Sequence, residues 1–191
     1  MTLGIQRFAT HQRMPWRNGG GVTYEVARWP AEGEFDWRIS IAEVAASGAF
    51  SAFPGIDRII MLVDGPEMVL TVDGDRHALQ PLVPFTFDGG SDTDCQVGEP
   101  TRDLNVMTTR GRASAGLDVV RVDDGADATV ASPDPLVLVG LTGTVVVSAD
   151  NGEDAELAAL DVAYWTGTPL TVTGSGALAV VRIRSTSISG G

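Results

Sequence analysis

The chain contains no lysine and a single cysteine, and these two absences limit its chemistry. All 13 basic residues are arginine, so a lysine Schiff base and a lysine general base are excluded. Cys95 alone can form neither an intramolecular disulfide nor a multi-cysteine zinc site, which favours a cytoplasmic protein. The sequence also lacks a run of about 20 apolar residues and an apolar N-terminal segment, so neither a membrane helix nor a signal peptide is expected.

Basic residues are also few relative to acidic ones, 13 against 25, and the net charge is −12 at pH 7. A surface of this sign repels phosphate backbones, so we expect no nucleic-acid partner, and the missing apolar segments predict no membrane partner. The length of 191 residues suits one ordinary domain or two small ones. A chain of this size buries about 70% of its unfolded surface and needs no metal or disulfide to fold.

Short apolar or alternating runs, broken by Gly, Pro, Asp and Asn, dominate the sequence and predict an all-β sandwich or barrel. The best helical candidate is Glu153–Ala163, whose end also reads as the start of a strand. The expected strands are Val22–Trp29, Asp36–Val44, Arg58–Val63, Glu67–Val72, Arg76–Leu79, Phe85–Asp88, Leu104–Thr109, Leu117–Val122, Leu136–Leu141, Thr144–Ser148, Ala163–Thr166 and Ala177–Arg184.

An internal repeat appears when the chain is shifted by 78 positions. The hairpin-type turn at Asp73–Asp75 then falls on Asn151–Glu153, and apolar or glycine positions on either side match without a gap. These matches are Gly65 with Gly143, Leu79 with Leu157, Leu82 with Leu160, Phe87 with Trp165, and Gly89 with Gly167. The repeat predicts two copies of one β-unit, with the acidic, small-residue stretch Asp123–Asp134 as their connector.

A glycine turn followed by an apolar segment and an aromatic residue resembles the cupin half-barrel, and two copies imply a bicupin. Cupins that hold a metal carry a His-x-His pair, a following Glu and a distal His. This chain has only His11 and His77, which lie far apart and are expected at the surface or in turns. Because a transition-metal site needs several converging ligands, we predict no metal and no cofactor.

Four motifs stand out in the first part of the chain: Pro15–Glu25, Asp36–Ala42, Gly48–Arg58 and Asp103–Met107. Together they resemble the signature of the HutD/Ves family of bicupins. The resemblance implies an all-β, metal-free bicupin with jelly-roll halves, linked to histidine utilisation and acting as a small-ligand-binding regulator. With the repeat, it places an N-terminal half with a ligand pocket at residues 1–115 and a packed C-terminal half at 116–191.

Alternation along three strands gathers polar groups on single faces. In Asp36–Val44, Val22–Trp29 and Leu104–Thr109, one face is apolar and the other carries polar groups among small residues. Such faces meet solvent in most antiparallel sheets, or they line a cavity with a few placed polar groups. Alternation alone favours solvent and the family resemblance favours a cavity. The candidate ligand-binding side chains are Arg38, Ser40, Thr23, Glu25 and Asn105.

Arg58 lies at the start of an apolar strand. Its guanidinium must be paired or solvated, because burying it without a partner costs several kcal/mol of folding free energy. Its partner is either Asp57 or Asp103 in a structural ion pair, or a ligand carboxylate held through two parallel hydrogen bonds. The sequence leaves these two alternatives open. Phe50 and Phe53 are expected at the rim of the same pocket.

The glycine-rich stretch Trp16–Gly21 suits neither strand nor helix. Successive glycines let a backbone approach a ligand or another strand closely, and a β-bulge or corner explains them equally well.

Three functions fit these features. The leading one is a regulator that binds a small carboxylate such as formylglutamate, formiminoglutamate or a urocanate-like acid, with no catalytic residues. The second is a metal-independent enzyme of the isomerase type, with Glu25 as base and Arg58 as anion clamp. The third is a scaffold for a protein partner. Homodimer formation is left open. Cys95 is a poor nucleophile, because its acidic neighbours raise the thiol pKa.

Overall fold

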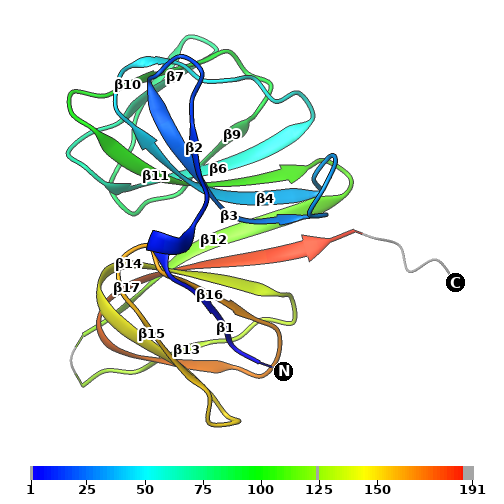
Figure 1. Cartoon of the computed structure of the whole chain (residues 1–191), viewed down its shortest axis with the longest axis vertical. Helices are drawn as coiled ribbons and strands as arrows, with labels where there is room; N and C mark the ends of the chain where they lie inside the picture. The colour runs from blue at the N-terminus through cyan, green and yellow to red at the C-terminus, as the bar shows by residue number, and fades with distance from the viewer. Residues whose placement is uncertain (1, 124, 187–191) are drawn as a thin grey trace, which may run out of the picture. The chain divides into compact units, whose positions relative to one another are not determined.

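The computed structural model describes residues 2–123 and 125–186 and is built from β-strands, with one short 3-10 helix at Phe8–Thr10 (Figure 1). The chain divides into two compact units. Among the described residues, the N-terminal unit contains Gln12–Ser114 with Ser185 and Thr186, and the C-terminal unit contains Ala115–Arg184 and the residues up to His11. The predicted all-β bicupin, with two jelly-roll halves related by a repeat, is confirmed.

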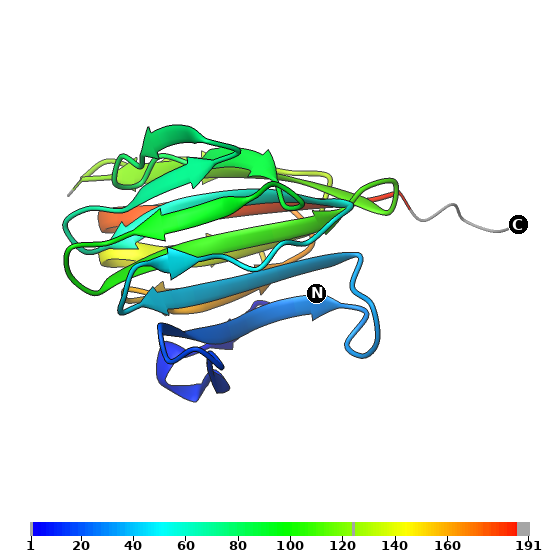
Figure 2. The same ribbon diagram turned by 90° about the horizontal axis from the view of Figure 1, so that it is seen from above.

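The N-terminal unit consists of a six-stranded and a four-stranded antiparallel sheet. Figure 2 shows β3 and β4 side by side, in blue, within the larger sheet. In spatial order the larger sheet is β2 (Arg13–Pro15), β3 (Gly21–Trp29), β4 (Trp37–Val44), β11 (Thr101–Thr109), β6 (Ile56–Asp64) and β9 (Phe85–Asp88). The smaller sheet is β5 (Gly48–Ala49), β10 (Thr93–Gln96), β7 (Val69–Val72) and β8 (Asp75–Ala78).

The C-terminal unit uses two long strands in place of several short ones. These strands, β14 (Leu136–Ala149) and β17 (Leu170–Ser185), pair along most of their length. The main path of the sheet is β1 (Gly4–Gln6), β16 (Val162–Trp165), β14, β17 and β12 (Ala113–Val122), while β13 (Ala128–Val130) pairs with β17 and β15 (Asp154–Leu157) pairs with β14.

The sequence repeat is also a repeat of backbone pairing. Ile60 pairs with Phe85 across β6 and β9, and Leu138 pairs with Ala163 across β14 and β16, so both partners are displaced by the same 78 positions. The register also shifts at equivalent places, leaving Val63 unpaired between β6 and β11 and Leu141 unpaired between β14 and β17. An extra residue of this kind is a β-bulge, which bends its strand.

Two leucines in the left-handed region mark the repeat a second time. Leu82 has φ 58° and Leu160 has φ 66°. The amide of Leu82 donates to the carbonyl of Leu62 at 2.9 Å, and the amide of Leu160 donates to the carbonyl of Gly140 at 2.8 Å. Because a left-handed residue with a side chain is strained, the same strain at both positions reflects one backbone design used twice.

The structure corrects two local expectations in the C-terminal unit. Leu136–Leu141 and Thr144–Ser148 form the single strand β14, because the bulge at Leu141 lets the strand bend and continue. Glu153–Ala163 is not a helix. It contains β15, whose Ala155 pairs with Val147 of β14, and cross-strand pairing outweighs the weak helical pattern.

The first strand of the chain lies in the C-terminal unit. Ile5 of β1 pairs with Ala163 of β16, so this segment adds a strand to the C-terminal sheet. Along the chain, the boundary between the observed units falls between Ser114 and Ala115. A division at residues 1–115 and 116–191 puts β1 with the N-terminal half, because a segment of three residues carries too little pattern to show its pairing partner.

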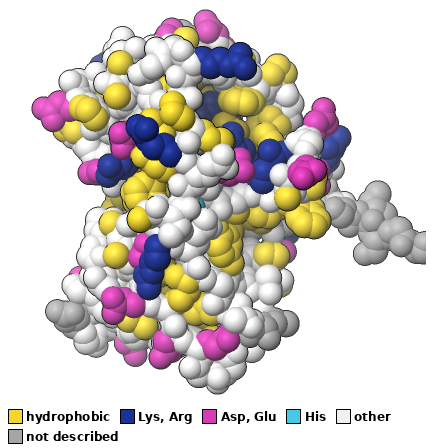
Figure 3. Space-filling view, viewed as in Figure 1, with side chains coloured by type: hydrophobic (Ala, Val, Ile, Leu, Met, Phe, Trp, Pro, Cys, Tyr) yellow, Lys and Arg dark blue, Asp and Glu magenta, His cyan; other side chains and the backbone are white. Residues whose placement is uncertain are grey.

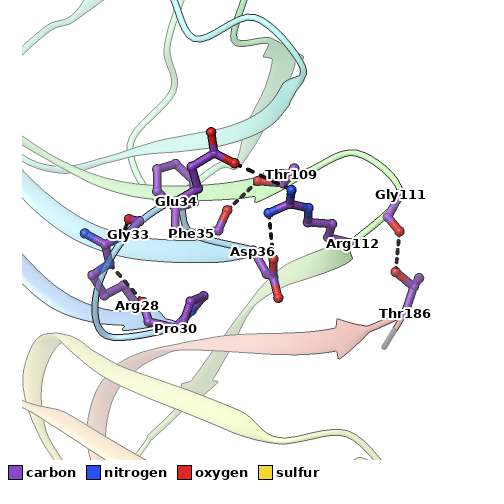
Figure 4. Close-up of polar contacts among 10 residues, drawn as sticks. All are labelled: Arg28, Pro30, Gly33, Glu34, Phe35, Asp36, Thr109, Gly111, Arg112 and Thr186. Atoms are coloured by element: carbon purple, nitrogen blue, oxygen red, sulfur yellow. Dashed lines mark hydrogen bonds and ion pairs between the residues drawn. The ribbon is translucent and has the colours of Figure 1, made fainter. Parts of the chain in front are cut away.

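The connection between β3 and β4 is fastened to the end of β11 (Figure 4). The Thr109 hydroxyl donates to the carbonyl of Phe35 at 2.6 Å, and the Arg112 guanidinium pairs with Glu34 and Asp36, each at 3.5 Å. These contacts attach the connection between β3 and β4 to the end of β11 and to the turn that follows it.

Candidate functional site

The inner face of the larger N-terminal sheet carries polar residues in three rows that follow the strand register. Asn105 of β11 stands in the middle row, opposite Ser40 of β4 and Ile60 of β6. The row on one side contains Arg58, Met107 and Arg38, and the row on the other contains Leu62, Asp103, Ala42 and Thr23. Alternation along β4 and β11 therefore brings residues distant in sequence onto one surface.

A pocket of about 520 Å³ opens on this face, and the N-terminal unit supplies all of its lining. Of the residues predicted from the sequence, Arg58, Arg38, Ser40, Asn105, Thr23, Phe50 and Phe53 line it. Glu25 is not in the lining. The remaining lining residues are Met14, Pro15, Trp16, Arg17, Asn18, Ala42, Ala49, Ser51, Asp103 and Met107. Mostly apolar walls with a few placed polar groups are typical of small-molecule sites.

Arg58 is buried, with 3% of its surface exposed, and three aromatic rings surround its guanidinium. Its central carbon lies 4.8 Å from the ring centre of Phe87, 5.5 Å from Phe50 and 5.8 Å from Phe53. Its Nε donates a long hydrogen bond of 3.4 Å to Oδ1 of Asn105. Burial lowers the pKa of Arg58 to about 10, so the group stays positively charged at neutral pH.

No acidic residue within the described ranges forms an ion pair with Arg58. Asp57, one expected partner, pairs with Arg110 at 2.6 Å. Asp103, the other, acts on the Arg58 charge only through space, and both of its oxygens lack a hydrogen-bond partner among the described residues. Of the two alternatives for Arg58, the structural ion pair is therefore absent from the described part of the chain.

The second cation of the pocket, Arg38, is already paired. Its Nε donates to Oε2 of Glu25 at 2.8 Å, and neither side chain is more than about a third exposed, at 18% and 29%. Glu25 thus acts on the pocket through Arg38. This position gives no support to Glu25 as a general base, because the carboxylate does not line the cavity.

Asp103 is one of the pocket residues that the sequence analysis did not place there. It is fully buried, and burial raises the pKa of its carboxyl to about 7 although the Arg58 charge opposes this shift. The expected strand began at Leu104, whereas β11 begins at Thr101. Extending the alternation of Asn105 and Met107 backward by two residues would have put Asp103 on the same face.

One wall of the pocket comes from the glycine-rich stretch after β2. Trp16 donates from Nε1 to the hydroxyl of Thr23 at 2.8 Å, and Arg17 and Asn18 follow it along the lining. A Cβ on Gly21 would lie 2.4 Å from the carbonyl oxygen of Glu43, so only glycine fits between the strands there. The glycines thus serve a close approach of two strands, and the residues before them line the pocket.

The remaining nucleophilic and metal-ligating side chains do not form a second centre. Cys95 is buried, and burial first, then Asp103 and Asp94, raise the pKa of its thiol to about 12. His11 follows the 3-10 helix and is buried beside Phe8, so a surface position is wrong for it. His77 lies within β8 rather than in a turn and is partly buried, with its ring 4.7 Å from that of Phe85. Over residues 2–123 and 125–186, no three His, Cys, Asp or Glu side chains gather as metal ligands.

Two jelly-roll units of one design, one of them with an arginine-containing pocket, define a bicupin with a candidate small-molecule site. The HutD family model matches residues 8–181, so the chain belongs to the HutD family. The resemblance seen in the four sequence motifs is confirmed.

Curated relatives match this chain over two thirds or more of its length. The chain is 42% identical over 135 residues to protein Ves of Citrobacter koseri, and the match covers 67% of this chain and 69% of that protein. It is 38% identical over 150 residues, 76% of this chain and 77% of the relative, to an uncharacterized 21.2 kDa protein in the hutC 3′ region of Pseudomonas putida. The family is thus linked by name and gene neighbourhood to the hut region.

Solved structures agree with the fold. HutD from Pseudomonas fluorescens SBW25, in a formate condition, superposes with a TM-score of 0.82 at 33% identity, covering 96% of this chain and 99% of that one. A cupin 2 conserved barrel domain protein from Leptotrichia buccalis superposes with a TM-score of 0.63 at 9% identity, over 86% and 89%, which shows the shared fold. A helix of sufficient length and hydropathy to cross a membrane is not found in the described ranges.

Proposed function

We propose that this protein binds a small carboxylate in the pocket of its N-terminal unit and that this binding regulates histidine utilisation. The observation that carries the proposal is Arg58, a buried cation that lines a cavity and has no ion pair among the described residues. A buried guanidinium in that state is satisfied by an anion, and carboxylates match its planar donors through two parallel hydrogen bonds.

The surroundings of Arg58 favour a small, flat acid over a large one. Phe50, Phe53 and Phe87 enclose the guanidinium, and the cavity of about 520 Å³ falls in the lower part of the range of small-molecule pockets. Ser40 and Asn105 lie in the row beside Arg58 and can hydrogen-bond the remainder of such a ligand. Formylglutamate, formiminoglutamate and urocanate all carry a carboxylate for Arg58, and of these three acids urocanate is the flat one with a single carboxylate.

The link to histidine utilisation rests on the relatives. One lies in the hutC 3′ region, and a HutD structure was obtained in a formate condition. We place the protein in the cytoplasm and assign it no nucleic-acid or membrane partner. On the face shown in Figure 3, arginine and acidic side chains are interspersed. The net charge of the chain is −12, and a surface of this sign repels a phosphate backbone.

Calorimetry with formate, urocanate and formylglutamate tests the proposal. At least one acid should bind, and Arg58→Ala should weaken that binding by roughly ten- to a hundredfold, because a hydrogen bond to a charged group contributes about 1.5–3 kcal/mol. Arg184→Ala, which removes an exposed arginine of β17, is the matched control and should leave affinity unchanged. Equal affinity of Arg58→Ala and the parent protein, with both folded, would refute the assignment.

The same samples separate the two other functions. Nuclear magnetic resonance of each acid after prolonged incubation would reveal the new product that an isomerase forms. A scaffold would bind none of the acids, and sedimentation would show whether a homodimer forms.

A further inference from the structure

Asp103 presents an unusual group to the pocket, a carboxyl that is fully buried and has no hydrogen-bond partner on either oxygen among the described residues. It stands between Leu62 and Ala42 in the sheet, so its lateral neighbours on β6 and β4 are apolar. An isolated carboxylate anion in such surroundings is strongly disfavoured, and the group either holds a proton or receives a partner from a ligand.

The charged and titratable groups around Asp103 come from four strands. Arg58 on β6 attracts the anionic form, while Arg38 on β4 is neutralised by Glu25 on β3. Cys95 on β10 remains a neutral thiol, because burial raises its pKa to about 12. Arg58 is therefore the charge that governs Asp103 in the empty pocket.

We propose that Asp103 determines the specificity of the pocket by donating a hydrogen bond, as the neutral acid, to an acceptor group on a ligand whose carboxylate is held by Arg58. The inference rests on the proposed carboxylate binding. It assigns the ligand to a class, small acids with a carboxylate at one end and an uncharged acceptor, such as an amide or formyl oxygen, towards the other.

Charge balance in the pocket supports the protonated form. A ligand carboxylate on Arg58 cancels the attraction that Arg58 exerts on the Asp103 anion, so burial alone then acts on Asp103. The carboxyl of Asp103 consequently takes a proton from solvent as the ligand enters. A ligand with a second full negative charge would leave an unbalanced negative charge in the pocket. A ligand with an ammonium group would favour the Asp103 anion over the neutral acid.

The spacing along β11 suits a two-ended ligand. Asp103, Asn105 and Met107 alternate on the pocket face, and Met107 is the residue opposite Arg58. Residues four apart in a strand are separated by about 13 Å at their Cα atoms. The Arg58 side chain extends along the sheet as far as Asn105. The distance that remains between its guanidinium and the Asp103 carboxyl therefore suits a ligand chain of a few bonds.

Direct titration tests the protonation without any ligand. The carbon-13 signal of the Asp103 carboxyl, assigned by its loss in Asp103→Asn, should titrate near neutral pH in the parent protein and at higher pH in Arg58→Ala. A midpoint in the ordinary range of aspartate would overturn the inference, whatever the protein binds.

Formate calorimetry in two buffers of different ionisation enthalpy tests the coupling. At pH 7 the parent should take up as much as about half a proton per formate bound, and Asp103→Asn should take up none. Binding of formate without proton uptake would refute this inference and leave carboxylate binding standing. Absence of formate binding to the parent would refute the coupling.

A matched pair of probes tests the specificity. The acid 4-acetamidobutyrate carries an uncharged acceptor where 4-aminobutyrate carries an ammonium group. The parent should prefer the acetamido acid by at least tenfold, Asp103→Asn should keep the preference because its amide also donates, and Asp103→Leu should lose it. A preference for the ammonium acid, or equal or absent binding of both, would overturn the two-ended ligand.

Discussion

The two units of this protein share a backbone design but differ in what they bury on it. The pairing registers make three pocket residues of the N-terminal unit equivalent to three core residues of the C-terminal unit. The pairs are Arg58 and Leu136, Asn105 and Val180, and Asp103 and Leu178. The latter members of the pairs belong to one apolar cluster and are at most 3% exposed.

The difference separates stability from function within one chain. Leu and Val at these places contribute about 1.5–3 kcal/mol each by burial, whereas Arg58 and Asp103 are buried at a cost. The N-terminal unit retains an apolar cluster around Ile60, Leu62 and Leu70 beside its pocket. A cupin half therefore tolerates polar groups on part of its inner face when the rest of that face packs tightly.

The largest effect on stability is expected when an aspartate like Asp103 is placed at the equivalent position in the apolar cluster of the C-terminal unit. Leu178→Asp should lower the free energy of unfolding by about 5 kcal/mol or more, because it removes a buried side chain and adds a carboxyl without a partner. Denaturation followed by circular dichroism measures the change. Asp103→Leu at the equivalent place is the control and should be neutral or stabilising; a strongly destabilised Asp103→Leu would contradict the comparison.

The pH dependence of stability should differ between the parent and Asp103→Asn. The Asp103 pKa is raised from 3.8 to about 7, so between these values the folded protein holds a proton that the unfolded chain has released. The stabilisation that this bound proton gives the folded protein is therefore lost as the pH rises from about 4 to 7. The free energy of unfolding falls by on the order of 4 kcal/mol in total. Urea unfolding at pH 4.5, 6 and 7.5 should show the parent losing stability relative to the variant, and parallel curves would exclude the raised pKa.

A smaller effect is expected from Asn105→Val, which copies Val180. The substitution removes the 3.4 Å acceptor of Arg58 Nε and leaves the guanidinium less well oriented. We expect carboxylate affinity to fall about three- to tenfold, in line with about 1 kcal/mol for one hydrogen bond. Calorimetry measures it, with Asn105→Ser as the polar control; unchanged affinity in Asn105→Val would mean that Asn105 does not position Arg58.

The smallest effect is expected on the C-terminal unit's surface. Arg182→Ala breaks a partly exposed ion pair with Asp118 and should change the free energy of unfolding by less than about 1 kcal/mol. Carboxylate affinity should stay as in the parent. A loss of affinity here would show that the C-terminal unit takes part in binding.

Strand length explains most of what the sequence predicted and what it missed. β3, β4, β6 and β11 have eight or nine residues and were predicted within a few residues of their ends. The strands β1, β2, β5 and β13 have three residues or fewer and were missed, because only their pairing partners define them. Strands of four residues fall into both groups, since β9 was predicted, β10 was missed and β15 was expected in a helix.

The candidate site was predicted as far as alternation and turns reach. Ser40 and Asn105 follow from period two. Glu25 keeps the same alternation, opposite Ser40, so its position outside the lining could not be predicted from period two and accompanies its ion pair with Arg38. The absence of an ion pair at Arg58 could not be predicted either. It depends on Asp57 turning to Arg110, whose sequence position gives no sign of that contact.

The left-handed residues Leu82 and Leu160 allow one backbone feature to be tested twice in the same molecule. Two copies of one strained residue, with equivalent amide hydrogen bonds, occur in one chain, and Leu160 is buried whereas Leu82 is partly exposed. The same replacement by glycine at each position would relieve the same backbone strain and remove a different amount of buried apolar surface. Any difference between the two measured stabilities would then report that difference in side-chain burial together with the response of each inner face, free of the uncertainty of comparing two proteins.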